Sequence, residues 1–167
     1  MSQKFTVLFD LDGTLVDTAP DLMIAHNHVM KKFGYKERDF SDIKKLAGGG
    51  SKAMLRKSIH AIAELSGKVK KADEKLEEEM TKEFIDFYSK NINTKSKLVT
   101  GVKEFLDWCK NNSVSMSVCT NKQEHLSIDL LKKIKIYHFF DYVAGGNTFN
   151  YNKPNPKHLT DVIEITG

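Results

Sequence analysis

The stretch Lys4-Phe-Thr-Val-Leu-Phe-Asp-Leu-Asp-Gly-Thr-Leu-Val-Asp-Thr18 decides the fold of this chain. Its apolar run, Phe5 to Phe9, leads directly into Asp10, Asp12 and Gly13. Such a run is typical of a strand buried on both faces of a parallel sheet. A lone buried carboxylate is costly, so we expect both acids where the strand ends, at the edge where open α/β sheets bind ligands. A plain Asp-Gly turn is the alternative, but a turn needs one acid and no apolar approach.

Size and composition predict a globular protein. The chain has 167 residues, 40% of them hydrophobic and 29% charged, which suffices for one domain or for a core with a small insert. No apolar stretch could span a bilayer, and the chain enters its first strand without a secretory leader. Cys109 and Cys119 lack metal-ligand spacing, so we expect buried, reduced thiols. Together these features predict a cytoplasmic protein with no membrane partner.

The charge pattern narrows the range of partners. The net charge is +4, and the lysines between residues 70 and 79 are interleaved with acids, as on a solvated helix face. Basic clusters with aromatic platforms are missing from the sequence, which argues against a nucleic-acid partner. A mildly basic balance suits a small anionic substrate. The sequence leaves open whether the chain is a monomer or a homodimer.

Helical periodicity follows the first strand and continues to about residue 93. Pro20 suits a first helical turn, Ser41 and Asp42 are expected to begin a short helix, and Ser51 is expected to cap a third helix that Gly67 closes. These helices predict a small bundle inserted directly after the first strand. We therefore expect residues 1–16 and 98–167 to form a core and residues 17–97 to form a cap that opens and closes over a site.

From Gly101 onward, helix and strand patterns alternate, with strands expected at Val114–Cys119 and Tyr142–Ala144. Alternation of this kind indicates a parallel sheet with crossover helices. The predicted fold class is thus α/β, with a Rossmann-like three-layer α/β/α core around a parallel sheet and an inserted α-helical bundle as a cap domain. Trp108, Phe139 and Phe140 are expected in the core.

Three strand ends carry polar groups: Asp10 with Asp12, Thr120 with Asn121, and Lys153 in Asn152-Lys-Pro-Asn-Pro156. The ends of parallel strands converge on one edge, so these groups would share one site. A carboxylate pair, a hydroxyl and an ammonium together fit a phosphoryl group bound with a hard cation.

The motifs resemble those of the haloacid dehalogenase superfamily. Asp10-Leu-Asp-Gly-Thr-Leu-Val-Asp17 is similar to the first motif of that family, Thr120-Asn-Lys to the second, and Lys153-Pro-Asn-Pro to the third. The resemblance implies that Asp10 attacks phosphorus and becomes an aspartyl-phosphate, while Asp12 protonates the leaving oxygen and then activates water. It also implies that the Asp10 carboxylate and the Asp12 backbone carbonyl bind Mg²⁺.

Phosphate binding follows from the same resemblance. Thr120, the Asn121 backbone N–H and the turn at Gly13 would hold the phosphate oxygens, and Lys153 would offset charge between nucleophile and phosphate. An acid at position 12 favours phosphate esters over halides, since a halide leaving group needs no proton. The expected partner is a small phosphorylated metabolite.

The second motif and the glycine segments Leu46–Lys52 and Val143–Asn147 resemble phosphoglycolate phosphatases. A β-phosphoglucomutase-like enzyme or a broad sugar phosphatase is the enzymatic alternative, and an inactive phosphate-binding remnant is the alternative from another class. We further hypothesise that Gly49 and Gly50, before a helix start, bind the substrate's carboxylate with Lys52 or Arg56. A simple turn between helices is the competing interpretation of these glycines.

The family's fourth motif, Gly-Asp-x-x-x-Asp, is missing from this sequence. It supplies a further metal ligand and follows a strand that would flank the first one, so the Phe5–Phe9 strand is expected to be an apolar edge. We therefore expect this sequence to be part of a longer phosphatase, or its edge to be covered by a second copy.

Overall fold

The computed structural model describes residues 5–42, 46, 50–65 and 74–167. The chain divides into two compact units: Met1–Thr18 with Lys95–Gly167, here the α/β unit, and Ala19–Thr94, here the helical unit. The α/β unit contains β1 (Thr6–Phe9), β2 (Val16–Asp17), β3 (Lys97–Leu98), α5 (Val102–Asn111), β4 (Ser115–Cys119), α6 (Glu124–Lys133), the 3₁₀ helix η2 (Tyr137–Phe139), β5 (Tyr142–Ala144) and α7 (Lys157–Thr166). The helical unit contains α1 (Ala19–Lys32), the 3₁₀ helix η1 (Phe40–Asp42), α3 (Gly50–Leu65) and α4 (Glu74–Lys90).

The main sheet of the α/β unit is parallel, with the strand order β1-β4-β5. Its register pairs Phe9 with Val118 and Cys119 with Ala144. The three strands therefore end side by side, and the residues that follow them, from Asp10, Thr120 and Gly145 onward, leave the sheet at one edge. Among the described strands β1 lies at the side of this sheet, as expected.

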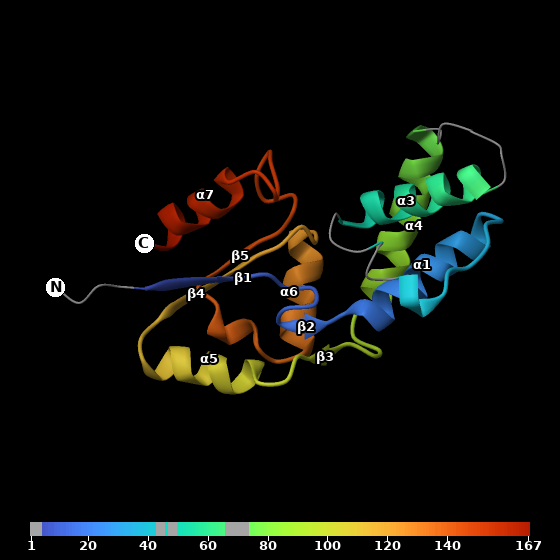
Figure 1. Ribbon diagram of the computed structural model, residues 1–167. Helices are drawn as coiled ribbons and strands as arrows, with labels where there is room; N and C mark the ends of the chain where they lie inside the picture. The colour runs from blue at the N-terminus through green and yellow to red at the C-terminus, as the bar shows by residue number, and fades with distance from the viewer. Residues whose placement is uncertain (1–4, 43–45, 47–49, 66–73) are drawn as a thin grey trace. The chain divides into compact units, whose positions relative to one another are not determined.

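Helices cover both faces of the sheet, as Figure 1 shows with α7 on one side of the strands and α5 on the other. Leu8 packs on the cluster of Cys119, Ala144 and Val162, the last of which belongs to α7. Its neighbour Phe9 instead meets Phe105 of α5, with ring centroids 6.0 Å apart. Successive strand residues point to opposite faces, so these contacts confirm the predicted three-layer α/β/α core.

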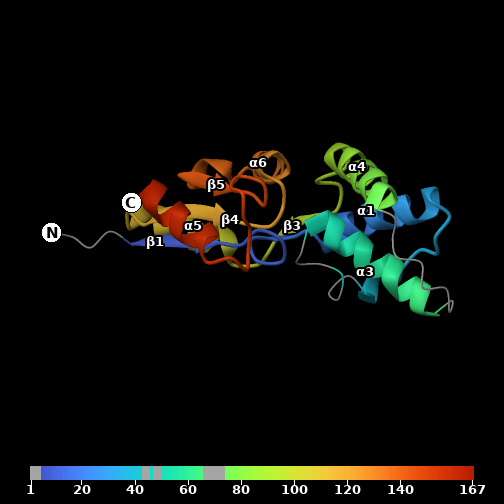
Figure 2. The same ribbon diagram turned by 90° about the horizontal axis from the view of Figure 1, so that it is seen from above.

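The helical unit is held together around α4, against which α1 and α3 both pack (Figure 2). Met80, Phe84 and Tyr88 of α4 are buried and recur at the spacing of one helix face. Two polar links join its helices: His26 and Ser58 lie 2.7 Å apart through Nε2 and Oγ, and the Arg56 guanidinium binds the carboxylate of buried Glu77 at 2.6–3.1 Å. Both links satisfy polar groups that would be costly to bury alone.

The two chain segments that lead to and from the helical unit are paired. Val16 pairs with Leu98 and Asp17 with Lys97, which makes β2 and β3 a short antiparallel ribbon inside the α/β unit. This ribbon brings the exit and the return of the chain together, so the helical insert interrupts the α/β unit at a single place. None of the described helices is both long and apolar enough to cross a membrane.

Three expectations about local structure need correction. Trp108 is 56% exposed and so lies outside the core, while Phe139 is buried and Phe140 half-buried. Trp108 shares a face of α5 with Phe105, on which it stacks at 6.1 Å, whereas the buried stripe is formed by Leu106 and Cys109. The exposed and buried pairs are each three residues apart and are offset by one residue, about 100° around the helix, so the second pair is buried, while Phe105 of the first pair still reaches Phe9 of the sheet.

The other corrections concern helix ends in the helical unit. Helix α3 begins at Gly50, so Ser51 is inside the helix and does not cap it. Ser41 and Asp42 belong to the 3₁₀ turn η1. Of the expected continuation of that helix only Leu46 is described, and the expected closure at Gly67 falls outside the described residues. Both cysteines are buried and free, as predicted.

Candidate active site

The turn after β1 is built on a buried leucine. The Leu11 carbonyl accepts hydrogen bonds from the backbone N–H groups of Thr14, Leu15 and Val16 at 3.1–3.3 Å, and Leu11 itself is fully buried. Gly13 has φ +79°, a left-handed conformation that costs residues with a Cβ about 1 kcal/mol or more, and it has open space around it. The turn therefore buries the Leu11 side chain, and Asp10 and Asp12 are its two neighbours in the sequence.

Asp10 is held at the end of β1 by two donors. Its Oδ1 accepts the Leu11 backbone N–H at 2.8 Å and lies 3.0 Å from Lys153 Nζ. The Asp10 side chain is 45% exposed and the Lys153 side chain 25% exposed, so a ligand from solvent can reach both. Residues 143 positions apart in the sequence thus meet as the expected pair of carboxylate and ammonium.

Asp12 has a different cation. Its Oδ1 accepts the Thr18 hydroxyl at 2.7 Å and the Lys122 ammonium at 3.0 Å. The side chain of Lys122 is only 5% exposed, in contrast to that of Lys153. Sequence reasoning missed both partners of Asp12. Lys122 stands in the Thr120-Asn121-Lys122 segment, which resembles the second motif of the family. Its positive charge was the one feature of the sequence that could have indicated a pairing with Asp12.

Thr120 follows β4 and is almost fully buried. Its backbone N–H donates to the Ala144 carbonyl at 2.9 Å, and its Oγ1 accepts the Lys122 N–H at 3.2 Å, so the hydroxyl hydrogen can still be given to a ligand. The Asn121 side chain donates from Nδ2 to the Lys153 carbonyl at 3.1 Å. The loops that follow β4 and β5 are thereby joined at the same edge of the sheet.

Two glycines let these loops approach closely. A Cβ on Gly145 would lie 2.2 Å from the Glu124 backbone nitrogen, and one on Gly146 would lie 2.4 Å from the Asn121 carbonyl oxygen. Gly146 uses this closeness to donate its N–H to the Lys122 carbonyl at 2.7 Å. The segment after β5 therefore fixes the backbone of the Lys122 loop, and no larger residue fits at either position without moving backbone.

Two buried groups next to the site keep their uncharged forms. Burial raises the pKa of the Cys119 thiol, and burial lowers the pKa of His158, whose Nε2 lies 3.2 Å from the Gly145 carbonyl oxygen. A thiol with a raised pKa is a poor nucleophile. Among the reactive groups near the strand ends, the exposed carboxylate of Asp10 is better suited to attack a substrate than Cys119.

The residues present fit a magnesium ion that keeps most of its water. Within the described residues no cluster of three or more His, Cys, Asp or Glu side chains could hold a metal. The Asp10 carboxylate is an exposed oxygen donor at the end of β1, and the family resemblance adds the Asp12 backbone carbonyl as an expected ligand. Mg²⁺ in phosphate-handling sites is commonly held by one or two carboxylates, waters and the phosphate itself, so this hard oxygen set suits it.

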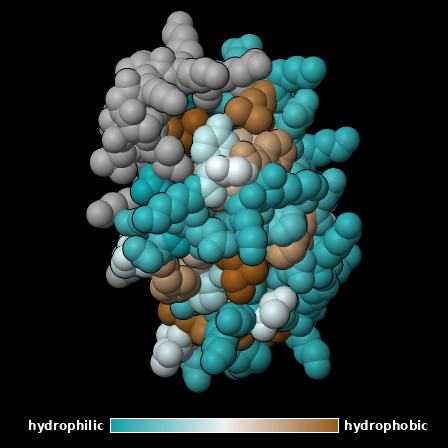
Figure 3. Space-filling model, turned by 90° about the vertical axis from the view of Figure 1, so that its right-hand side faces the viewer, coloured by the Kyte–Doolittle hydropathy of each residue, from teal (hydrophilic) through white to brown (hydrophobic). Residues whose placement is uncertain are grey.

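The residues expected to choose the substrate lie in the helical unit. Gly49 is outside the described residues, and Gly50 is the first residue of α3, with φ +81°. Arg56 is engaged by the buried Glu77 carboxylate. Lys52 borders an open hollow of about 350 Å³ that is lined by Glu78, Thr81, Lys82, Ile85 and Asp86. Much of the molecular face in Figure 3 is hydrophilic, with scattered apolar patches.

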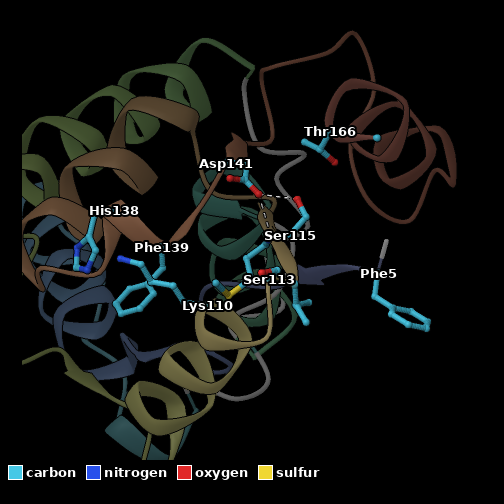
Figure 4. Close-up of a pocket in the computed structure, with 11 residues that line it drawn as sticks. Phe5, Lys110, Ser113, Ser115, His138, Phe139, Asp141 and Thr166 are labelled. Atoms are coloured by element: carbon cyan, nitrogen blue, oxygen red, sulfur yellow. Dashed lines mark hydrogen bonds between the residues drawn. The ribbon is translucent and has the colours of Figure 1, made fainter. Parts of the chain in front are cut away.

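A second hollow, of about 360 Å³, lies in the α/β unit, at the end of the sheet where the strands begin (Figure 4). It is lined by residues at the beginnings of strands, among them Phe5, Ser115 and Asp141. Asp141 accepts hydrogen bonds there from the Ser115 hydroxyl and the Met116 N–H. Because the acids Asp10 and Asp12 follow the end of a strand, this hollow is separate from the candidate active site.

The fold is that of an α/β protein with a helical insert after its first strand, and comparison with known proteins identifies the family. Residues 7–167 match the model of the haloacid dehalogenase-like hydrolase family. This chain therefore belongs to the haloacid dehalogenase-like hydrolases.

Named relatives are phosphoglycolate phosphatases. The enzyme of Mesorhizobium japonicum is 35% identical over 161 residues, which are 96% of this chain and 68% of the relative. That of Agrobacterium fabrum is 33% identical over 160 residues, 96% of this chain and 66% of the relative. Relatives from Pseudomonas aeruginosa and others are covered over 57% of their length, so the chain spans between about half and two thirds of the relatives it matches.

Solved structures show the same fold. The crystal structure of a predicted phosphoglycolate phosphatase from Haemophilus somnus superposes with a TM-score of 0.87 at 25% identity, covering 97% of this chain and 71% of that one. A haloacid dehalogenase-like hydrolase from Bacteroides fragilis gives a TM-score of 0.80 at 20% identity, covering 98% and 73%. Because the identity to the second structure is only 20%, the similarity shows the fold alone.

Proposed function

We propose that the protein is a Mg²⁺-dependent phosphomonoester hydrolase that acts through an aspartyl-phosphate on Asp10, with phosphoglycolate or a similar small phosphorylated acid as substrate. The observation that carries this proposal is the exposed Asp10 carboxylate at the end of β1, 3.0 Å from the Lys153 ammonium. A nucleophilic oxygen beside a cation is what attack on a phosphate dianion requires. The names of the relatives support the choice of substrate.

In the first step, an Asp10 oxygen forms a bond to phosphorus and the bond between phosphorus and the ester oxygen breaks. Asp12 gives its proton to that leaving oxygen, so the product departs as a neutral alcohol. Help of this kind is worth about 10²–10⁴ in rate. Asp12 suits the role because a single leucine separates it from Asp10 and the turn presents both acids at one edge of the sheet.

In the second step, water attacks the phosphorus of the aspartyl-phosphate and gives a proton to the Asp12 carboxylate. The bond between phosphorus and the Asp10 oxygen breaks, which releases inorganic phosphate and restores both acids. Proton balance is complete within each turnover, since Asp12 regains the proton that it lost in the first step.

The remaining groups would bind and neutralise the phosphoryl group. The Thr120 hydroxyl and the Asn121 N–H would donate to its oxygens, the turn at Gly13 would leave room for it, and Lys153 would offset its charge. The Asp10 carboxylate and the Asp12 backbone carbonyl would hold Mg²⁺, which polarises the phosphoryl oxygens when bound.

We propose Lys52 as the group that binds the carboxylate of the substrate. Both candidate cations belong to α3, but the Arg56 guanidinium is held at 2.6 Å by Glu77, whose side chain is only 4% exposed. Releasing Arg56 would break a hydrogen-bonded ion pair to a buried carboxylate, which is strongly unfavourable. Lys52 is exposed, and the charge it carries is available for a substrate of the opposite sign.

The direct test is phosphate release from phosphoglycolate in the presence of Mg²⁺. We expect turnover by the natural sequence, a fall of about 10³-fold or more in Asp10→Asn, and loss of activity with EDTA. Asp107→Asn is the matched control, because Asp107 forms an exposed ion pair with Lys103 on α5 and should leave the rate unchanged. Turnover that survives in Asp10→Asn would rule out the mechanism, and phosphate binding without turnover would favour a binding protein.

A further inference from the structure

Lys122 is a lysine whose charge lies almost out of reach of solvent. Its side chain is 5% exposed, and its ammonium lies 3.0 Å from Asp12 Oδ1. Burying a charge is costly unless a partner offsets it, and the described partner of this ammonium is the Asp12 carboxylate. Asp12 is the acid to which the proposed function assigns proton transfer, and the inference below rests on that function.

Two donors converge on one oxygen of Asp12. The Thr18 hydroxyl donates to Oδ1 at 2.7 Å and the Lys122 ammonium at 3.0 Å. In the described part of the chain no residue donates a hydrogen bond to Oδ2. The two donors on Oδ1 thus restrain the orientation of the carboxylate, and the side chain is 28% exposed, so a ligand can reach it. Rotation about the last side-chain bond would break both contacts.

The backbone that delivers Lys122 is itself fixed. Its carbonyl accepts the Gly146 N–H at 2.7 Å, and its N–H donates to Thr120 Oγ1 at 3.2 Å. Two residues further on, the Glu124 N–H donates to Asn147 Oδ1 at 2.8 Å. Bonds on both sides of Lys122 therefore hold the start of its side chain, and the ammonium reaches Asp12 from a rigid base.

We propose that Lys122 is a positioning residue that holds Asp12 Oδ1 so that Oδ2 faces the leaving oxygen of the substrate. Its role differs from that of Lys153, which contacts the nucleophile Asp10 and is reachable by phosphate. In this proposal Lys122 influences the reaction through its contact with Asp12. Its effect is therefore confined to substrates whose leaving oxygen needs a proton, which makes it a determinant of preference for alkyl over activated aryl phosphates.

The test compares two substrates that differ in their need for a proton. Phosphoglycolate releases a poor leaving group, whereas 2,4-dinitrophenyl phosphate releases a stable anion. We expect Lys122→Met to lower kcat/KM for phosphoglycolate by about 10²-fold and that for the aryl ester by less than about tenfold, in keeping with the usual value of general acid help. Lys122→Arg, which keeps a cation, should restore part of the loss.

Lys133→Met is the matched control, since it removes an exposed ion pair with Asp129 at 3.1 Å on α6 and should leave both rates unchanged. Thermal unfolding of each variant checks that it folds. Equal losses on the two substrates in a folded Lys122→Met would overturn the inference and leave the proposed function standing. Two other results would contradict the proposed function itself: no turnover by the natural sequence, or turnover that persists in Asp10→Asn.

A crystal structure of Lys122→Met decides the geometry independently of turnover. We expect the Asp12 carboxylate to leave its single orientation, either rotating away from Thr18 or occupying two rotamers. An Asp12 that keeps Oδ1 on the Thr18 hydroxyl in one rotamer would show that Lys122 does not position it and would contradict the inference.

Discussion

At the scale of residues, the site consists of two pairs of opposite charge with different exposure. Asp10 and Lys153 are both reachable from solvent, whereas Asp12 is paired with a lysine that is almost fully buried. Like charges that lie close together repel strongly in a partly buried site, so each acid needs its own cation. In the proposed reaction the exposed pair would open to admit a phosphate, and the pair of Asp12 and Lys122 would keep its geometry during that step.

The sequence alone predicted that Asp10 and Lys153 meet, and it did not predict that Asp12 and Lys122 meet. Asp10, Thr120 and Lys153 follow strand ends, and parallel topology brings strand ends together. Lys122 also follows a strand end, but strand order does not say whether a long side chain turns toward Asp12 or toward solvent. Side-chain direction within a loop depends on local backbone bonds, here those from Gly146 and Thr120, that no periodicity reports.

A prediction at this scale concerns Lys52. Lys52→Ala should raise KM for phosphoglycolate about five- to thirtyfold, a loss of about 1–2 kcal/mol for one charged hydrogen bond. It should leave KM for 4-nitrophenyl phosphate unchanged, because that ester has no carboxylate. Steady-state kinetics on both substrates measures the ratio of their two KM values.

Arg56→Ala serves as the comparison for Lys52→Ala. This change removes the guanidinium that binds the buried Glu77 carboxylate at 2.6 Å, so we expect a lower melting temperature. If Lys52→Ala left the ratio of the two KM values as in the natural sequence, the assignment of the carboxylate to Lys52 would be wrong.

At the scale of elements, the long elements were predictable and the short ones were not. The strands β4 and β5 and the helices of the α/β unit follow apolar patterns that the sequence displays. The two-residue strands β2 and β3 are too short for a pattern and exist because distant segments pair. A cap at Ser51 would start α3 at Lys52, whereas the helix starts two residues earlier, at Gly50, because the backbone and not the capping side chain determines the first turn.

The element that holds the site together is the segment after β5, and Gly145 tests it. Gly145→Ala places a Cβ 2.2 Å from the Glu124 backbone nitrogen, a clash that backbone movement must relieve. We expect a loss of about 2–3 kcal/mol in the free energy of unfolding, in the upper range for overpacking, together with weaker phosphate binding. Urea unfolding and calorimetric titration with phosphate provide the two measurements.

Gly101→Ala is the matched control for Gly145→Ala. Gly101 has φ +86° and open space where a Cβ would be, so alanine should cost about 1 kcal/mol of backbone strain and leave phosphate binding intact. Equal destabilisation by the two changes, with phosphate binding retained in both, would show that the close approach at Gly145 does not support the site.

At the scale of the whole molecule, the proposed function assigns different tasks to the two units. The α/β unit contains Asp10, Asp12, Thr120, Lys122 and Lys153, and the helical unit contains Lys52. Because β2 and β3 pair, the helical unit leaves and rejoins the α/β unit at one place, next to the turn that presents the acids. An insert connected in this way can vary its residues without disturbing the acids, which is consistent with chemistry in one unit and substrate choice in the other.

The measurement that tests the central claim most directly is a crystal structure of the protein with Mg²⁺ and beryllium fluoride, a mimic of a phosphoryl group. We predict beryllium bonded to a carboxylate oxygen of Asp10, with its fluorides contacting the Thr120 hydroxyl and the Lys153 ammonium. Beryllium fluoride bound to Asp12, or lodged away from the turn after β1, would contradict the account.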